Sequence, residues 1–126
     1  MLVKWLYNVD DWEQGFHRKI HDGINSRIFC GKQVMISVCN VNPHTEELMH
    51  SHPEEQWGYL VKGEGIRLQG EEQAQVFAGD FWYTPGGVSH GFVTGNFACT
   101  ILDIFSPPRG SYMESSPGYG NAEVHK

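Results

Sequence analysis

The sequence predicts an all-β domain, and the spacing of turns together with the composition carries that prediction. Glycine-containing turn signals recur at residues 63–65, 70–72, 78–80, 85–87 and 94–96. Short segments between regularly spaced turns are typical of antiparallel sandwiches and barrels. The 15 glycines, and 13% aromatic against 19% charged residues, favour tight turns and packed rings over long charged helices. The 126 residues are enough for one domain and too few for two of ordinary size.

The segments between these turns have the chemistry of strands. We expect strands at residues 34–41, 56–62, 66–69, 74–78, 81–84, 90–93 and 98–106. A short helical stretch is expected near residues 11–21, because Trp12, Phe16 and Ile20 recur every four residues. After residue 110 the sequence is rich in Ser, Pro, Gly and Asn. Residues 1–110 are therefore expected to form one domain, and residues 111–126 a flexible tail.

The last expected strand is apolar on both faces. Residues 99, 101, 103 and 105 share one face, and residues 100, 102 and 104 share the other. One face is expected to look into the barrel and the other to meet a second sheet or another subunit, which predicts a homodimer. The aromatic residues Trp57, Tyr59, Trp82 and Tyr83 are interpreted as core or subunit contacts rather than as a sugar platform.

Charge and cysteine content restrict the partners and the compartment. The net charge of −6 argues against a general surface for nucleic acid or anionic membranes, so a small molecule is the expected partner. Residues 1–11 contain no apolar run long enough for a signal peptide, and nothing in the chain approaches a transmembrane span. Cys30, Cys39 and Cys99 form an odd set without C-x-x-C spacing, which suits reduced thiols. The expected location is the cytoplasm.

Three of the seven histidines have the spacing of metal ligands. His50 and His52 are two residues apart, so on an extended strand both side chains leave the same face. Gln56 has the same parity, and His90 follows a Pro-Gly-Gly turn. Three imidazoles and one amide oxygen would leave positions of a divalent ion open to substrate, as in a catalytic site. The ion could be Zn, Ni, Mn or Fe, because such a site accepts several metals.

The acidic residues near these histidines are interpreted as surface charges. Glu54 and Glu55 are read as solvated charges flanking a loop, with coordination of the ion by either of them left open. Four other glutamates are interpreted as turn or edge charges that discourage sheet aggregation: Glu46, Glu47, Glu71 and Glu72.

A second group of functional candidates lies at the end of the last strand. Asp103 stands on its apolar inner face, where desolvation raises a carboxyl pKa toward the range useful for proton transfer. Phe105 and then Arg109 follow, and the planar guanidinium suits a substrate carboxylate. From the residues alone, an internal Asp103–Arg109 ion pair that closes the barrel is equally compatible.

The histidine pattern resembles the cupin superfamily, whose members are small β-barrels with two histidine-bearing motifs. The first motif is matched by His50, His52, Gln56 and Gly63. The second is matched by the glycine, proline, glycine and histidine at residues 79, 85, 87 and 90. His44 stands where the first motif begins with glycine, and Gln56 replaces the usual glutamate. The resemblance implies a single jelly-roll-type cupin barrel over about residues 28–106.

Residues 102–109, 50–56 and 15–20 further resemble the KdgF group of cupins, which convert 4,5-unsaturated monouronates from pectin or alginate lyases to linear 5-keto-4-deoxyuronate. This resemblance implies the residues at positions 50, 52, 56 and 90 as ligands of one divalent metal ion. It implies Asp103, Phe105 and Arg109 as substrate-handling residues, and a sugar acid as substrate. Two other functions stay open: a cupin dioxygenase or metal-dependent lyase on another small substrate, and a non-catalytic sugar-acid binding module.

Overall fold

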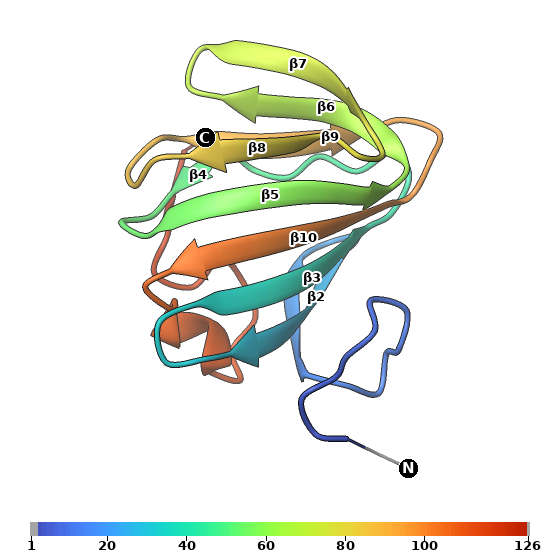
Figure 1. Cartoon of the computed structure of the whole chain (residues 1–126). Helices are drawn as coiled ribbons and strands as arrows, with labels where there is room; N and C mark the ends of the chain where they lie inside the picture. The colour runs from blue at the N-terminus through green and yellow to red at the C-terminus, as the bar shows by residue number, and fades with distance from the viewer. Residues whose placement is uncertain (1–2, 126) are drawn as a thin grey trace.

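The computed structural model describes residues 3–125 as two antiparallel sheets that face each other (Figure 1). The six-stranded sheet has the order β1-β2-β3-β10-β5-β8, and the five-stranded sheet has the order β11-β4-β9-β6-β7. The strands are β1 (Phe16–His21), β2 (Ile24–Cys30), β3 (Met35–Val41), β4 (His50–Ser51), β5 (Glu55–Lys62), β6 (Glu64–Gln69), β7 (Glu72–Phe77), β8 (Phe81–Thr84), β9 (His90–Thr94), β10 (Cys99–Ser106) and β11 (Glu123–Val124). A single 3-10 turn, η1 (Gly110–Met113), follows β10. The all-β prediction is confirmed.

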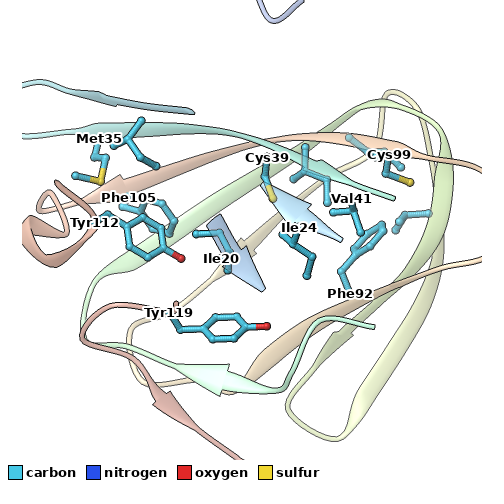
Figure 2. Packing of buried hydrophobic residues seen from close by; sticks show 14 residues of the cluster. Ile20, Ile24, Met35, Cys39, Val41, Phe92, Cys99, Phe105, Tyr112 and Tyr119 are labelled. Carbon is cyan, nitrogen blue, oxygen red and sulfur yellow. The ribbon is translucent and has the colours of Figure 1, made fainter. Parts of the chain in front are cut away.

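The core lies between the two sheets. Buried apolar side chains fill the space between them, with Phe105 and Tyr112 at one end and Val41, Cys99 and Phe92 at the other (Figure 2). Strand β10 is central to this packing, because it pairs with β3 on one side and with β5 on the other. Its inner face is the predicted one, so Asp103 and Phe105 both point toward the interior cavity.

The expected strands after residue 34 are all present, with ends that differ by a few residues. The expected helical stretch near residues 11–21 is wrong: residues 16–21 form strand β1, which pairs with β2 through a turn at Gly23 with φ of 78°. A four-residue spacing of apolar residues is a multiple of the strand period as well as close to a helical turn, so it did not discriminate between them. Arg18 and Ile20 are buried while Lys19 between them is exposed, which is the period of a strand.

A buried arginine fixes the chain that precedes β1. Arg27 is fully buried, its guanidinium lies 4.5 Å from the ring centroid of Trp12, and it donates hydrogen bonds to the carbonyls of Val9 and Asp11. These contacts hold residues 8–12 in an irregular segment against the sheet, so the indole covers a guanidinium instead of lying on a helix face.

His44 has φ of 52°, in the left-handed region that favours glycine. It is the residue that stands where the family motif begins with glycine. Its backbone N–H donates to the carbonyl of Gly95 at 2.8 Å, and the N–H of Thr45 donates to Thr94 Oγ1 at 2.9 Å. The turn is therefore kept without the glycine, through hydrogen bonds to the β9–β10 connection.

Residues 110–125 differ from the flexible tail expected for residues 111–126. The segment packs along one end of the barrel, with Tyr112 and Tyr119 buried and β11 paired with β4. Arg18 donates to the carbonyls of Gly118, Ser111 and Glu114 at 3.0, 2.9 and 2.9 Å. The segment is ordered despite its polar composition, because the buried guanidinium of Arg18 donates hydrogen bonds to its backbone carbonyls. Lys126 lies outside the described residues.

The outer face of β5 and β8 exposes aromatic rings. Trp57, Tyr59, Phe81 and Tyr83 are 44%, 40%, 69% and 39% exposed. Trp82, by contrast, points inward and stacks on Phe92 with ring centroids 6.0 Å apart. Within residues 3–125, no helix has the length and apolar character needed to span a bilayer.

Candidate active site

The structure brings together the three histidines that the spacing selects. His50 and His90 are paired in register across β4 and β9, and His52 follows β4 immediately. All three are buried, and one ring nitrogen of each lies within 4.8 Å of the others. Neighbouring sheet positions thus convert sequence spacing into one cluster of nitrogen ligands.

Backbone carbonyls fix the tautomer of each ring. Nδ1 of His50, His52 and His90 lies 2.7, 3.0 and 2.9 Å from a main-chain carbonyl oxygen. A carbonyl only accepts, so Nδ1 is the protonated nitrogen and Nε2 of each ring carries a free lone pair. This is the orientation in which metal-ligating histidines are held.

No hydrogen-bond donor meets Nε2 of His52 or of His90 in the described chain. Gln56 Oε1 lies 3.1 Å from His52 Nε2, and both atoms carry lone pairs without a proton between them. Buried His90 Nε2 has no hydrogen-bond partner among the described residues. A cation near these atoms would satisfy both observations. The donor set therefore fits one divalent metal ion held by His50, His52, His90 and Gln56.

Burial keeps the three imidazoles neutral. Desolvation lowers the pKa of His50 and of His52 to about 4, and it lowers the pKa of His90 to about 2. The charge of Arg109 acts in the same direction on His50 and His52, and that of Arg67 on His90. Neutral imidazole is the form that binds metal, so no proton has to be displaced at neutral pH.

Asp103 holds the amide of Gln56 in position. Gln56 Nε2 donates to Asp103 Oδ1 at 2.9 Å, which turns Oε1 toward His52. Burial raises the pKa of Asp103 to about 7, and the nearby Glu47 carboxyl also raises it. Arg67 and Arg109 oppose this effect. Asp103 can therefore both orient a ligand and exchange a proton near neutral pH.

Arg109 lies at the same end of the barrel, and its guanidinium is buried. It is 3.9 Å from the ring centroid of Tyr112 and 5.1 Å from that of Phe105. Its Nε donates to Asn121 Oδ1 at 3.2 Å and its Nη2 to the carbonyl of Tyr119, while Nη1 has no partner in the described part of the chain. No Asp103–Arg109 ion pair within 4.0 Å is found among residues 3–125. The geometry thus leaves the two N–H donors of Nη1 for another acceptor.

The two glutamates beside the histidines are not positioned as ligands. Glu54 is buried, but its Oε1 lies 3.6 Å from His52 Nδ1, on the side of the ring away from Nε2. It also accepts from Asn121 Nδ2 at 3.1 Å. Glu55 is exposed and accepts from Tyr83 at 2.9 Å. Glu54 supports the orientation of His52, and Glu55 belongs to the surface.

The candidate site surrounds an interior cavity that leaves room for about one or two water molecules. Its lining includes the candidate ligands His50, Gln56 and His90 and the charged or ionisable side chains of Asp103, Arg109, Arg67 and Glu47. The sequence did not single out Arg67, and it placed Glu47 among the surface charges. Arg67 is buried on β6 and donates to Thr84 Oγ1 at 2.8 Å, while its Nε has no partner in the described chain. Glu47 was expected at an edge; only its alternation with exposed Glu46 could have indicated an inward side chain.

The C-terminal segment covers the cavity from one end. The ring of Tyr119 lies 4.4 Å from that of His50, centroid to centroid, and its hydroxyl accepts from the N–H of Leu48 at 3.0 Å. Asn121 joins Arg109 to Glu54. Because Tyr119 and Asn121 lie about 70 residues beyond His50 and His52 in sequence, no local motif indicates their position.

Comparison with known proteins places this fold. Residues 37–105, more than half of the chain, match the family described as Cupin domain. The chain belongs to the cupin family. Its fold is the jelly-roll-type barrel that the two histidine motifs implied. No match was found among the curated proteins.

Solved structures resemble this cupin over most of its length. An RmlC-like cupin from Shewanella frigidimarina has 26% identity and a TM-score of 0.71, covering 79% of this chain and 90% of that one. KdgF from Halomonas sp. has 22% identity and a TM-score of 0.72, covering 79% and 94%. Oxalate decarboxylase from Bacillus subtilis has 20% identity and a TM-score of 0.68, covering 76% of this chain but only 28% of that one. The protein is thus a small cupin that resembles KdgF.

Proposed function

We propose that this cupin is a metal-dependent enzyme that opens the ring of 4,5-unsaturated monouronates, or acts on a closely related sugar acid. The observation that carries the proposal is the cavity itself. Neutral histidine nitrogens and the Gln56 oxygen converge there beside Asp103 and an unpartnered N–H of Arg109. The resemblance of residues 50–56 and 102–109 to the KdgF group, whose members linearise such uronates, supports the same substrate class, and KdgF from Halomonas sp. has a similar fold.

The residues of the cavity divide the work of binding this substrate. Arg109 Nη1 has no partner within the described chain, and it suits the uronate carboxylate. Phe105 is buried beside Arg109 and forms an apolar wall for the sugar ring. A divalent ion held by the histidines and Gln56 would act as a Lewis acid toward substrate oxygens.

Ring opening needs a group that accepts a proton. In the closed substrate, the C1 hydroxyl must lose its proton while the C1–ring-oxygen bond breaks, which leaves an aldehyde at C1 and an enolate at C5. Asp103 lies in the cavity and has a pKa of about 7. In our proposal its carboxylate takes the hydroxyl proton as a general base. The neutral Gln56 amide would leave the full charge of a bound divalent ion available to stabilise negative charge on substrate oxygens.

The cavity must widen to admit a monosaccharide, because it now leaves room for only about one or two water molecules. We propose that residues 110–125 move when substrate binds. Tyr119 is flanked by Gly118 and Gly120, with φ of 111° and 65°, and Asn121 carries the polar contacts of this segment to Arg109 and Glu54. Movement of this segment would release Arg109 from the Tyr119 carbonyl.

The direct test gives metal-loaded protein freshly prepared 4,5-unsaturated monouronate and follows the ultraviolet absorbance of the double bond. The expected result is decay well above the spontaneous rate, with loss of that acceleration after chelation and a strong decrease of it in Asp103→Asn. Glu55→Gln, an exposed carboxylate on the neighbouring strand, is the matched control. Decay at the spontaneous rate would overturn the proposal, and tight sugar-acid binding without turnover would identify a binding module. Oxygen consumption with a reduced metal would identify an oxygenase.

We further propose that the protein is a homodimer formed through the outer face of β5 and β8. Exposed Trp57, Tyr59 and Tyr83 lie on this face, beside the half-buried Leu102 and Ile104 of β10. Large exposed apolar patches commonly mark interfaces. Light scattering on the eluting protein should give twice the chain mass, and Trp57→Lys should shift it toward one chain. Phe97→Lys, an exposed aromatic in a distant turn, should leave the mass unchanged. A monomer at all concentrations would contradict the proposal.

A further inference from the structure

The cavity contains a second carboxyl group, that of Glu47, for which the proposed ring opening assigns no role. Glu47 lies in the segment between β3 and β4, and its backbone N–H donates to the carbonyl of Phe92 on β9 at 2.8 Å. The preceding Glu46 is exposed and forms an isolated bridge with Val93. The alternation of strands therefore turns Glu46 outward and Glu47 into the cavity.

The Glu47 carboxyl has no hydrogen bond or ion pair within 4.0 Å to any other side chain in residues 3–125. The charged and titratable groups that act on it or respond to it are Arg67 of β6, Arg109, His21 of β1, Asp103 of β10, Cys39 of β3, Tyr112 and Tyr119. Burial raises the pKa of Glu47 to about 7, against the charges of Arg67 and Arg109. An unpaired interior carboxyl is costly to keep, which is typical of functional sites.

The chemistry of the proposed reaction requires two proton transfers. The first removes the proton of the C1 hydroxyl as the C1–ring-oxygen bond breaks, and the electron pair of that bond moves to the ring oxygen. The second adds a proton to C4 as the enolate collapses to the C5 ketone, and the electron pair of the C4–C5 double bond forms the new C–H bond. One proton leaves and one is added, so the step is an isomerisation that needs no further reactant.

The two reacting positions lie on opposite sides of the sugar ring, because C1 and C4 face each other across a six-membered ring. A single carboxyl group is poorly placed to serve both. Asp103 belongs to the six-stranded sheet, while Glu47 is anchored to β9 of the five-stranded sheet. The two carboxyls thus enter the cavity from facing sheets.

Resting on the proposed ring opening, we propose that Glu47 is a second catalytic residue, which delivers the proton to C4 while Asp103 takes the proton from the C1 hydroxyl. Arg67, buried next to it and lacking a partner for Nε within the described chain, is the cation that stabilises the Glu47 carboxylate left behind. The base, Asp103, and the acid, Glu47, then act on the sugar ring from the two facing sheets.

The test is the stereochemistry of deuterium incorporation at C4, read by NMR at early times in deuterated water. Wild-type protein should place deuterium in one of the two C4 positions, because a fixed acid delivers it from one face. Glu47→Gln should lower kcat roughly 100-fold or more. It should also distribute deuterium over both positions, because water then protonates the released enolate. Glu46→Gln, the exposed neighbour, should behave like wild type.

Two further variants separate this inference from the function on which it rests. In Asp103→Asn, ring opening should slow while the product that forms keeps deuterium on one face. Glu47→Asp, which retains a shorter carboxyl, should recover part of the selectivity, and metal content and thermal midpoint report whether each variant is folded. Inactive wild-type protein would remove the proposed function. Active wild-type protein with an equally fast and equally selective Glu47→Gln variant would overturn the role of Glu47 alone.

Discussion

The Asp103→Asn variant tests the electrostatics of the cavity without any substrate. Asn keeps an oxygen that can accept the hydrogen bond from Gln56 Nε2, so the variant preserves the shape of the site and the 2.9 Å contact. What it removes is a carboxyl whose pKa burial raises from 3.8 to about 7. A native pKa above the unfolded one means that ionisation opposes folding. The contribution of this group to the free energy of unfolding therefore falls as pH rises from about 4 to about 7, and it levels off above the native pKa.

The magnitude follows from the linkage relation. With an unfolded pKa of 3.8 and a native pKa of about 7, this one group lowers the free energy of unfolding of the metal-free protein by about 2.6 kcal/mol between pH 5 and pH 8. Asp103 is only half-buried within the cavity, and screening by water there reduces this to about 1–2 kcal/mol. Relative to wild type, Asp103→Asn should gain that much stability at pH 8 and little at pH 5.

Urea unfolding of metal-free wild type and Asp103→Asn at both pH values measures this difference. Glu55→Gln, which removes an exposed carboxylate outside the cavity, is the control. A stability difference that is the same at pH 5 and pH 8 would refute the argument that burial raises the Asp103 pKa. In the same variant, turnover should fall strongly while metal content stays normal. Loss of metal would instead show that Asp103 acts mainly by holding Gln56.

Three other variants probe separate parts of the structure. His90→Ala should lower the affinity for a divalent ion, measured by calorimetry. The loss should exceed the roughly 10- to 100-fold that follows when a residue supporting a ligand is removed. Unchanged affinity would exclude His90 as a ligand. His44→Val should lower the unfolding free energy by about 1–2 kcal/mol, because a β-branched residue strains the left-handed backbone, whereas a loss with His44→Gly would contradict this. Tyr119→Phe should cost about 1 kcal/mol in denaturant titration by leaving a backbone N–H unpaired, with metal content unchanged.

The clustering of the three histidines could be predicted from the sequence because it depends on local rules. The two-residue spacing of His50 and His52 puts them on one face, and the turn before β9 places His90 opposite β4. Asp103 and Phe105 were predictable for the same reason, since alternation along one long strand decides which side chains face the interior. For the helical stretch expected near residues 11–21, the same apolar spacing fitted both periods, and pairing with β2 decided in favour of a strand.

The remaining parts of the cavity depend on long-range contacts that no local pattern encodes. Glu47 is indistinguishable in sequence from its exposed neighbour Glu46 until the segment is anchored to β9. The C-terminal segment is ordered by Arg18, roughly 100 residues away in sequence, through hydrogen bonds to main-chain carbonyls of any residue type. Arg109 was expected to reach substrate or Asp103. Its hydrogen-bond acceptors, Tyr119 and Asn121, belong to that segment, and its Nε also lies 4.0 Å from Glu54 Oε1.

The amide at position 56 connects these observations into one electrostatic argument. A glutamate there would neutralise part of the charge of a divalent ion, and it would face the Asp103 carboxylate without an N–H to donate. Gln56 instead donates to Asp103 and turns only a neutral oxygen toward the cation site, so Asp103 stays free to exchange a proton. The buried Arg67 and Arg109 add positive charge to the same cavity, against Asp103 and Glu47, whose carboxyls burial tends to protonate. In a chain of net charge −6, this interior therefore suits the small anionic substrate that we propose.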